Sequence, residues 1–423
     1  MELISSYNLI IEVSVIIILS FLFNGISKKT NIPAVLLLIG LGIILQYVLK
    51  HYTSDQVDFF PILEVLGIVG LIMIVLEAAL ELELKREKLI PILKSMAIAS
   101  IGLGASTWAA AYILYYYIPE MTWQSAWLYA TPLSILSSAI IIPSVSGLKG
   151  KKREFHIYES TFSDILGIML FYFLSGKFDP AEDTGLVGFG GNFLLTVAIS
   201  IVASYAIILI FQNIKSQVKL FLLIAVLLLL YAVGKKMHLS SLIIILIFGL
   251  VIANMQLFFK GKLAKWVNFE KAHQIYHELH TITAETAFVV RTFFFVIFGL
   301  TIAITSLFSV EVALISTLLI ASIYAIRFVL VFIFEGKDIL PQVFIAPRGL
   351  ITVLLFYAIP VEAQIASFEP GILLFVIIGT SLIMTFAMIY EKKRSSKALK
   401  IAENRGVGSI KWKAPSVLEE KPE

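Results

Sequence analysis

Long runs of apolar residues follow one another along most of this chain, and short polar or charged segments separate them. Most runs are about twenty residues long, enough for an α-helix to cross the roughly 30 Å hydrocarbon core of a bilayer. We therefore predict about thirteen membrane-spanning helices. They lie near residues 7–26, 32–49, 61–80, 92–117, 125–147, 156–176, 188–213, 217–233, 239–255, 283–305, 309–335, 340–359 and 371–390.

The charges between these runs alternate along the chain. Basic residues follow every odd-numbered span, as with Lys28 after the first span and Lys149 after the fifth. The other connections are mostly acidic, with Lys235 and Lys236 as the exception. By the positive-inside rule, this alternation predicts an N-terminus outside the cell and a C-terminus in the cytoplasm. We expect an integral protein of the cytoplasmic (inner) membrane, with its first span retained because no cleavage signal precedes it.

Composition supports the membrane assignment. Hydrophobic residues make up 59% of the 423 residues and charged residues only 15%, against about 25% charged residues in soluble domains. The chain has no cysteine, which excludes disulfides, thiolate metal sites and cysteine nucleophiles. We expect no cofactor, no resident metal and no nucleic-acid partner; the lipid bilayer is the expected environment.

The odd number of spans suggests an internal repeat. We place two six-helix repeats at about 1–176 and 217–390, a linker helix at about 188–213 and a short cytoplasmic tail at 391–423. An odd linker helix inverts the second repeat relative to the first. The predicted fold class is therefore an all-α membrane protein, whose transmembrane domain at 1–390 contains two inverted repeats with crossed broken helices.

The fifth span of each repeat is interrupted by proline and by small or polar residues. The interruption includes Ser137, Ser138 and Ala139 in the first repeat, and Arg348 and Gly349 in the second. Proline within a helix frees a backbone carbonyl, and freed carbonyls at membrane depth survive where they line a cavity or bind an ion. We interpret both spans as broken helices that cross; the alternative is two merely kinked helices.

Asp164 lies near the middle of a predicted span, where a charged side chain is costly. The hydroxyl residues Ser160 and Ser163 precede it. A carboxylate that holds either a proton or a cation, but never both, couples the flows of the two ions. We therefore interpret Asp164 as the cation- and proton-binding residue, assisted by Ser160, Ser163 and Ser138. The alternative is a structural aspartate paired with an arginine.

Other ionisable residues in the spans have candidate roles of their own. Glu159 and Arg327 carry opposite charges in different spans, and we predict that they form a structural ion pair. Glu77 lies in the inner half of the third span and is a further candidate for cation binding. Arg291 is a candidate for compensating the charge of Asp164 when no cation is bound.

Several of these segments resemble sodium/proton exchangers of the monovalent cation:proton antiporter superfamily. Residues 159–164 read Glu-Ser-Thr-Phe-Ser-Asp and resemble the Glu-Ser-x-x-Asn-Asp motif of that family. Residues 76–80 resemble its Phe-Glu-Gly-Gly-Leu segment, 348–350 its Arg-Gly motif, and 293–300 its Phe-Phe-x-x-x-Gly-Leu stretch. Arg327 looks like the arginine that pairs with the motif glutamate. The resemblance runs over spans 2 to 13 in the family's order.

The resemblance implies a particular assembly and use of residues. It implies a homodimer in which spans 1–3 and 8–10 form a scaffold and spans 4–6 and 11–13 form a moving core. It also implies that Glu77 is a cation ligand.

Two departures bear on the transported ion. Ser163 stands where the family has Asn in its electroneutral branch and Asp in its electrogenic branch. The first interruption lacks the usual Thr-Asp-Pro and is closer to the Ser-Ser-Thr pattern of potassium efflux antiporters, with Ala139 in place of the threonine.

The sequence therefore predicts a secondary active antiporter that exchanges Na⁺ or K⁺ for H⁺ by alternating access. Electrogenic members of the family have two adjacent acidic residues where this chain has Ser163 and Asp164. Because only one carboxylate is left to carry a proton, we expect electroneutral exchange. The alternative is a sodium-coupled symporter of a small organic anion on a similar fold. An enzyme is not expected, since no two carboxylates clearly share one helix face and no histidine falls in the middle of a predicted span.

Three of the histidines outside the predicted spans lie close together in the sequence. His273, His277 and His280 follow one another at helical spacing within 260–282, which we predict to be an amphipathic helix on the cytoplasmic surface. Three readings stay open for them: polar residues of an interfacial helix, sensors of cytoplasmic pH, or zinc ligands.

Overall fold

The computed structural model describes residues 6–30, 32–52, 60–82, 84, 86–148, 150–178, 185–214, 219–237, 241–261, 263–301, 307, 309–336 and 339–404. Within these residues every regular element is a helix and no strand occurs. Lys149 and the last part of the predicted tail, 405–423, lie outside the described residues.

The first half of the chain forms helices that follow the predicted spans. They are α1 (Ser6–Thr30), α2 (Ala34–Tyr52), α3 (Phe60–Glu81), α4 (Leu89–Tyr117), α5 (Trp123–Ser134), α6 (Ser138–Ser144) and α7 (Gly150–Ser175). The predicted fifth span is thus two helices, α5 and α6, separated by a non-helical segment.

The second half of the chain also forms helices that follow the predicted spans, and it also contains one broken span. Its helices are α8 (Gly185–Phe211), α9 (Lys219–Lys236), α10 (Ser241–Ala253), the short α11 (Met255–Phe258), α12 (Phe269–Thr301), α13 (Val310–Glu335), α14 (Leu350–Tyr357) and α15 (Gly371–Asn404). The twelfth predicted span is the single turn η6 (Gln342–Phe344) followed, after a second non-helical segment, by α14.

The described helices have the length and surface of membrane spans. Seven helical segments are long and apolar enough to cross a bilayer, α5 and α6 counting together as one, and α2 and α10 are among the shorter apolar helices. Large apolar side chains are exposed around the bundle, including Ile90 at 81% and Phe21 at 72%. Exposed apolar surface of this kind faces lipid in an integral membrane protein.

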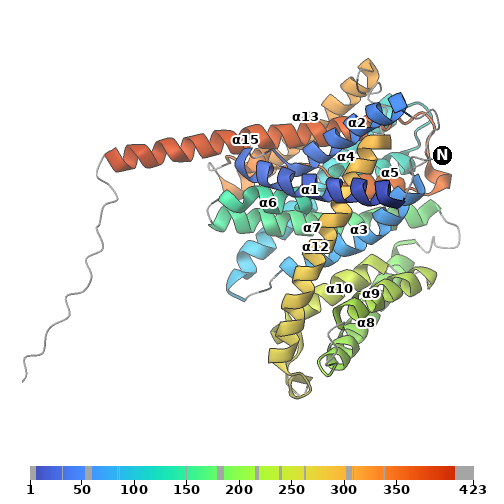
Figure 1. Ribbon diagram of the computed structural model, residues 1–423, viewed down its shortest axis with the longest axis vertical. Helices are drawn as coiled ribbons and strands as arrows, with labels where there is room; N and C mark the ends of the chain where they lie inside the picture. The colour runs from blue at the N-terminus through green and yellow to red at the C-terminus, as the bar shows by residue number, and fades with distance from the viewer. Residues whose placement is uncertain are drawn as a thin grey trace, which may run out of the picture.

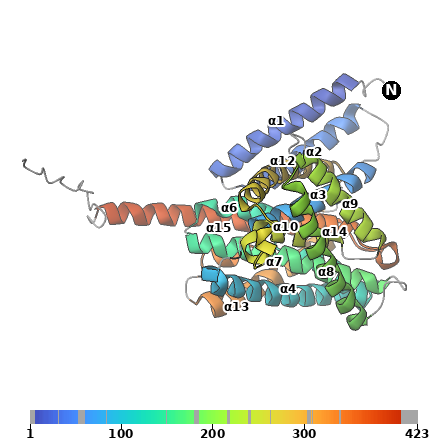
Figure 2. The same ribbon diagram turned by 90° about the horizontal axis from the view of Figure 1, so that it is seen from below.

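The helices form two groups by their packing. In the first, α12 packs against α1, α2 and α3, and α10 packs against α3, α8 and α9. In the second, α4 packs against α5, α7 and α13, and α13 packs against α15. Figure 2 shows α1 and α2 on one side of the molecule, and α4 and α13 on the opposite side. We call these the scaffold group (α1–α3 and α8–α12) and the core group (α4–α7 and α13–α15).

Within the scaffold group, α2 and α12 approach each other closely at two glycines. A Cβ atom on Gly42 would overlap the carbonyl oxygen of Val296, and one on Gly299 would overlap that of Ile39. Small residues at a crossing let two membrane helices bring their backbones together. Gly42 and Gly299 therefore determine how α12 sits against α2.

The helix predicted at 260–282 is confirmed only from Phe269 onward, and it is not separate from the tenth span. Residues 269–282 are helical, but they continue without a break into the span, so that α12 has 33 residues. Neither proline nor glycine occurs in α12 before Gly299, and nothing in the backbone therefore ends the helix earlier. Figure 1 shows α12 as one continuous helix, and it also shows α15 extending beyond the rest of the bundle.

Candidate ion-binding site

The first interruption lies between α5 and α6. Helix α5 ends at Ser134, and Ile135 (φ −72°, ψ 131°) and Ser137 (φ −94°, ψ 101°) have extended backbones. The N–H of Leu136, between them, donates to Oγ of Ser163 in α7 at 3.0 Å. The extended segment is thus held against α7 by one of the hydroxyls that the sequence singled out.

The second interruption, residues 345–349, contacts the first directly. The N–H of Ser137 donates to the carbonyl oxygen of Pro347 at 3.0 Å. A Cβ atom on Gly349 would lie 2.5 Å from Oγ of Ser137, so any larger residue here would displace this serine. The two broken helices therefore meet at their non-helical segments.

Arg348 lies at this meeting point and is 1% exposed. Its Nε donates to the carbonyl oxygen of Leu133 at 2.7 Å, and its Nη1 donates to that of Ala346 at 3.0 Å. Leu133 is in the last turn of α5, where unpaired carbonyls carry partial negative charge. The guanidinium thus compensates the carboxyl end of α5 and the second interruption. The backbone N–H of Arg348 donates to Oγ1 of Thr380 in α15 at 3.1 Å.

Asp164 in α7 is buried, with 2% of its surface exposed. Neither of its carboxylate oxygens has a hydrogen-bond partner within the described part of the chain. The hydroxyl and the backbone N–H of Ser138, at the amino end of α6, lie beside this carboxylate. A buried carboxylate without a partner is costly unless a proton or a cation neutralises it.

Two hydroxyl oxygens of the site, one in α7 and one in the first interruption, are also buried without a hydrogen-bond partner in the described residues. Thr161, three residues before Asp164 and so on the same face of α7, has an unpartnered Oγ1, and Ser137 has an unpartnered Oγ. By contrast, Oγ of Ser160 donates to the carbonyl oxygen of His156 in its own helix at 2.7 Å. Sequence reasoning missed Thr161, although its spacing from Asp164 was a usable signal.

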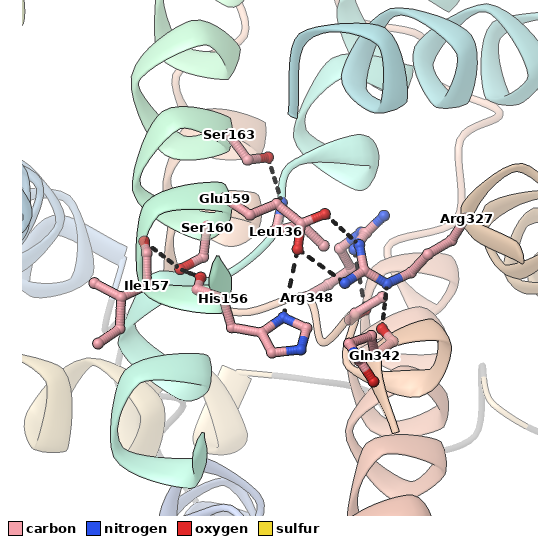
Figure 3. A network of polar contacts seen from close by, with 10 residues as sticks. Leu136, His156, Ile157, Glu159, Ser160, Ser163, Arg327, Gln342 and Arg348 are labelled. Carbon is pink, nitrogen blue, oxygen red and sulfur yellow. Dashed lines mark hydrogen bonds and ion pairs between the residues drawn. The ribbon is translucent and has the colours of Figure 1, made fainter. Parts of the chain in front are cut away.

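Glu159 and Arg327 lie together, one turn of α7 away from Asp164. Nη1 and Nη2 of Arg327 donate to the two carboxylate oxygens of Glu159 at 2.8 Å and 3.0 Å. Nε of Arg327 donates to the carbonyl oxygen of Gln342 at 2.9 Å. Figure 3 shows this network with Arg348 beside it. It ties α7, α13 and η6 to one another inside the core group.

His156, the first residue of the predicted sixth span, completes this network. It is fully buried in α7, and its Nδ1 lies 3.4 Å from Oε2 of Glu159. Helix α7 begins at Gly150, six residues before the predicted start of the span, because residues 150–155 join the helix despite their charges. The third group around the Glu159 carboxylate was therefore not predicted.

Arg291 contacts Glu77 and the first broken helix; no hydrogen bond from it to Asp164 is found within the described residues. Its Nη2 donates to Oε2 of Glu77 at 3.1 Å, and its Nη1 donates to the carbonyl oxygen of Ala139 at 3.1 Å. The carbonyl of Ala139 would normally bond to the N–H four residues later, which is Pro143 and has none. Arg291 thus links α12 and α3 of the scaffold group to α6 of the core group.

A small cavity of about 30 Å³ opens beside the crossing, enough for one or two water molecules. Its polar lining consists of Ser106, Ser134, Glu159, Ser163, Arg327 and Arg348. Ser163 and the Glu159–Arg327 ion pair thus line the same cavity.

This arrangement of crossed broken helices around a buried carboxylate can be compared with known proteins. A family model described as sodium/hydrogen exchanger, transmembrane, matches residues 15–390. The chain belongs to the sodium/hydrogen exchanger family. A comparison with curated proteins finds no match.

Solved structures of the sodium proton antiporter MjNhaP1 from Methanocaldococcus jannaschii have a similar fold. The structure at pH 8 aligns with a TM-score of 0.67 and 19% identity, covering 92% of this chain and 99% of that chain. A structure from an electron-microscopy map of the same antiporter aligns with a TM-score of 0.64 and 20% identity, covering 97% of this chain and 100% of that chain. The fold predicted from the sequence, an all-helical membrane protein of the sodium/proton antiporter type, is confirmed.

Proposed function

We propose that this protein exchanges a monovalent cation, Na⁺ or K⁺, for H⁺ by alternating access, and that the exchange is electroneutral. Membership of the sodium/hydrogen exchanger family supports cation/proton antiport by an integral membrane protein rather than enzymatic activity. The observation that carries the finer proposal is the Asp164 carboxylate, which is buried, unpartnered and next to the meeting point of the two broken helices.

The coupling follows from the charge of this one carboxylate. An empty, ionised Asp164 is costly in its buried position. Either a proton or a monovalent cation removes that cost, whereas both together would leave a net positive charge in the same place. The two ions therefore compete for Asp164, and each crosses the membrane with the carboxylate neutralised.

The neighbouring groups support a stoichiometry of one cation to one proton. The Glu159 carboxylate receives two hydrogen bonds from Arg327, which keeps it ionised and occupied. Ser163 has no titrating group and accepts a hydrogen bond from Leu136. Asp164 is thus the carboxylate of this region that is left to exchange a proton, and a cation and a proton exchanged one for one move no net charge.

Ser138, Ser137 and Thr161 are the proposed oxygen ligands that complete the cation's shell around Asp164. Ser138 places its hydroxyl and its backbone N–H beside the carboxylate. Ser137 and Thr161 have buried hydroxyl oxygens without partners in the described part of the chain, and hard oxygen donors suit alkali-metal cations. Glu77 is held by Arg291 in this conformation, and we propose that it becomes a ligand only when that contact opens.

We further propose that the core group moves against the scaffold group and that two copies assemble through their scaffold groups. The separate packing of the two groups supports this division. The distribution of basic loops supports an N-terminus outside and a C-terminus in the cytoplasm of the cytoplasmic membrane.

The test is cation-driven proton movement in proteoliposomes, measured with a pH-sensitive dye for Na⁺, K⁺ and Li⁺ separately. We expect Na⁺ or K⁺ to collapse an imposed pH gradient at a saturable rate, with protein-free liposomes as the control. Proton movement that is the same with choline as the only cation present would contradict antiport.

A further inference from the structure

The exposed first turns of α12 carry two imidazoles that face each other. His273 and His277 are separated by one helical turn, and their Nε2 atoms lie 2.9 Å apart. Their rings are nearly perpendicular, with centroids 4.4 Å apart. We propose that this pair is a binding site for a divalent transition-metal ion that prefers nitrogen ligands, with Cu²⁺ bound most tightly.

The distance between the two nitrogens selects the geometry of the metal. With metal–nitrogen bonds of about 2.0–2.1 Å, a separation of 2.9 Å corresponds to an angle of about 90° at the metal. That is the angle between neighbouring ligands in the square-planar or tetragonal sites that Cu²⁺ and Ni²⁺ adopt. A tetrahedral Zn²⁺ site would need the nitrogens to move apart to about 3.3 Å. The pair therefore favours Cu²⁺ and Ni²⁺ over Zn²⁺, and water completes the coordination.

The two rings are held in place by their surroundings. The ring of Tyr276 stacks on that of His273, with centroids 6.0 Å apart, and contacts that of His277 at 5.3 Å. The hydroxyl of Tyr276 donates to the carbonyl oxygen of Leu80 in α3 at 3.1 Å, which fixes this ring. The imidazoles are therefore partly ordered before a metal arrives, which lowers the entropic cost of binding.

The two imidazoles are exposed at the polar end of α12. Thirty-three helical residues extend about 50 Å, well beyond the roughly 30 Å of hydrocarbon. The polar residues of α12 gather in its first turns, and both His273 and His277 are exposed. Glu270, in the first turn, offsets the positive end of the helix dipole that would otherwise oppose a cation.

The third histidine of the cluster has a different partner and serves as a control. Nε2 of His280 lies 3.1 Å from Oε1 of Glu81 in α3, so this ring links α12 to the scaffold group. Glu278, on the same stretch, is occupied by Lys219 at 2.9 Å. Among the described residues, the proposed chelate therefore consists of His273 and His277.

The test is isothermal titration of tag-free protein in detergent with Cu²⁺, Ni²⁺, Zn²⁺ and Mg²⁺ at neutral pH. We compare the wild-type chain with His273→Gln, His277→Gln and the matched control His280→Gln. Losing one arm of a chelate should weaken Cu²⁺ binding about 100-fold, whereas His280→Gln should bind as the wild type does. The expected order is Cu²⁺ tighter than Ni²⁺ and Zn²⁺, with no binding of Mg²⁺.

Electron paramagnetic resonance of the Cu²⁺ complex identifies the ligands directly. We expect two equatorial nitrogens in the wild-type protein and at most one in either single variant. An unchanged Cu²⁺ affinity in His277→Gln, or wild-type protein that binds no Cu²⁺, would overturn the proposal and leave a simple hydrogen bond between two imidazoles. These experiments measure metal binding and not transport, so their outcome is independent of whether the proposed antiport is correct.

Discussion

Arg291 donates a hydrogen bond of 3.1 Å to the carbonyl oxygen of Ala139, and this acceptor is free because Pro143 stands four residues later. The bond joins the longest span of the scaffold group to the first turn of α6, next to Ser138. The same guanidinium also donates to Glu77 in α3. Arg291 therefore connects the scaffold group to the core group, and this contact must break if the core group moves against the scaffold group. We infer that Arg291 acts as a latch for the conformation seen here.

The latch makes a prediction about access to the crossing. Hydrogen bonds to charged groups contribute about 1.5–3 kcal/mol, so Arg291→Gln should shift the conformational equilibrium roughly tenfold or more. The chain has no cysteine, so Ser137→Cys introduces a single site for thiol labelling. We expect Arg291→Gln to increase the rate at which a water-soluble thiol reagent labels this cysteine.

Pro143→Ala provides a matched variant for the same latch. It restores an N–H that competes for the carbonyl of Ala139 without changing any charge. The labelling rate should rise in the same direction, whereas Arg153→Gln, at an exposed position of α7, should leave it unchanged. Equal labelling in all these variants would rule out the latch.

The buried ion pair makes a prediction about stability. Removing one partner of a buried pair leaves an uncompensated charge and typically costs about 3–5 kcal/mol. Glu159→Gln and Arg327→Gln should therefore each lower the unfolding temperature in detergent, and the double variant should lose less than the sum of the two. Lys88 and Glu154, a half-exposed pair at 2.7 Å, provide a control cycle with a coupling of about 1 kcal/mol or less. Strictly additive losses for Glu159 and Arg327 would argue against a direct pair.

The packing of α12 on α2 makes a third prediction. Gly42→Ala places a methyl group on the backbone of α12 and should destabilise the fold by about 1–3 kcal/mol. Gly40 lies in the same helix with nothing within 4 Å of a Cβ atom, so Gly40→Ala should be neutral or slightly stabilising. Thermal unfolding of both variants in detergent measures the difference, and equal midpoints would show that the close approach is not required.

Much of the fold could be predicted because it is encoded locally. Runs of apolar residues fix the spans, and proline with glycine or serine fixes the two breaks, including the crossing residues Ser137 and Gly349. Opposite charges buried in separate spans, Glu159 and Arg327, have few other ways to be satisfied, which is why their contact was foreseeable.

The features that were not predicted depend on long-range geometry. The bond from Arg291 to Ala139 joins residues 152 positions apart, and no local pattern encodes which acceptor an arginine reaches. His156 was missed because α7 begins before the apolar run, and α12 was divided because its first turns are polar although nothing breaks the helix. The amphipathic pattern of residues 269–282 indicated a helix, but not that this helix would continue into the tenth span.

Electroneutral exchange makes a prediction about voltage. A transport cycle that moves one net charge would gain or lose about 2.3 kcal/mol per 100 mV. We expect the rate of Na⁺/H⁺ exchange in proteoliposomes to be the same at membrane potentials set to zero, negative and positive values with K⁺ and valinomycin. A parallel series with the same K⁺ concentrations but without valinomycin shows how far K⁺ alone, by competing with Na⁺, changes the rate. A rate that changes systematically with potential would contradict a one-for-one stoichiometry.

The most direct measurement is the release of protons when cation is added to the purified protein in weakly buffered detergent solution. If Asp164 holds either ion but not both, Na⁺ or K⁺ should release up to one proton for each cation bound. Asp164→Asn, which keeps the shape but not the titrating group, should release none while remaining folded, and Glu154→Gln in the same helix should behave as the wild type. Proton release that persists in Asp164→Asn, or cation binding to the wild-type protein without proton release, would contradict the account.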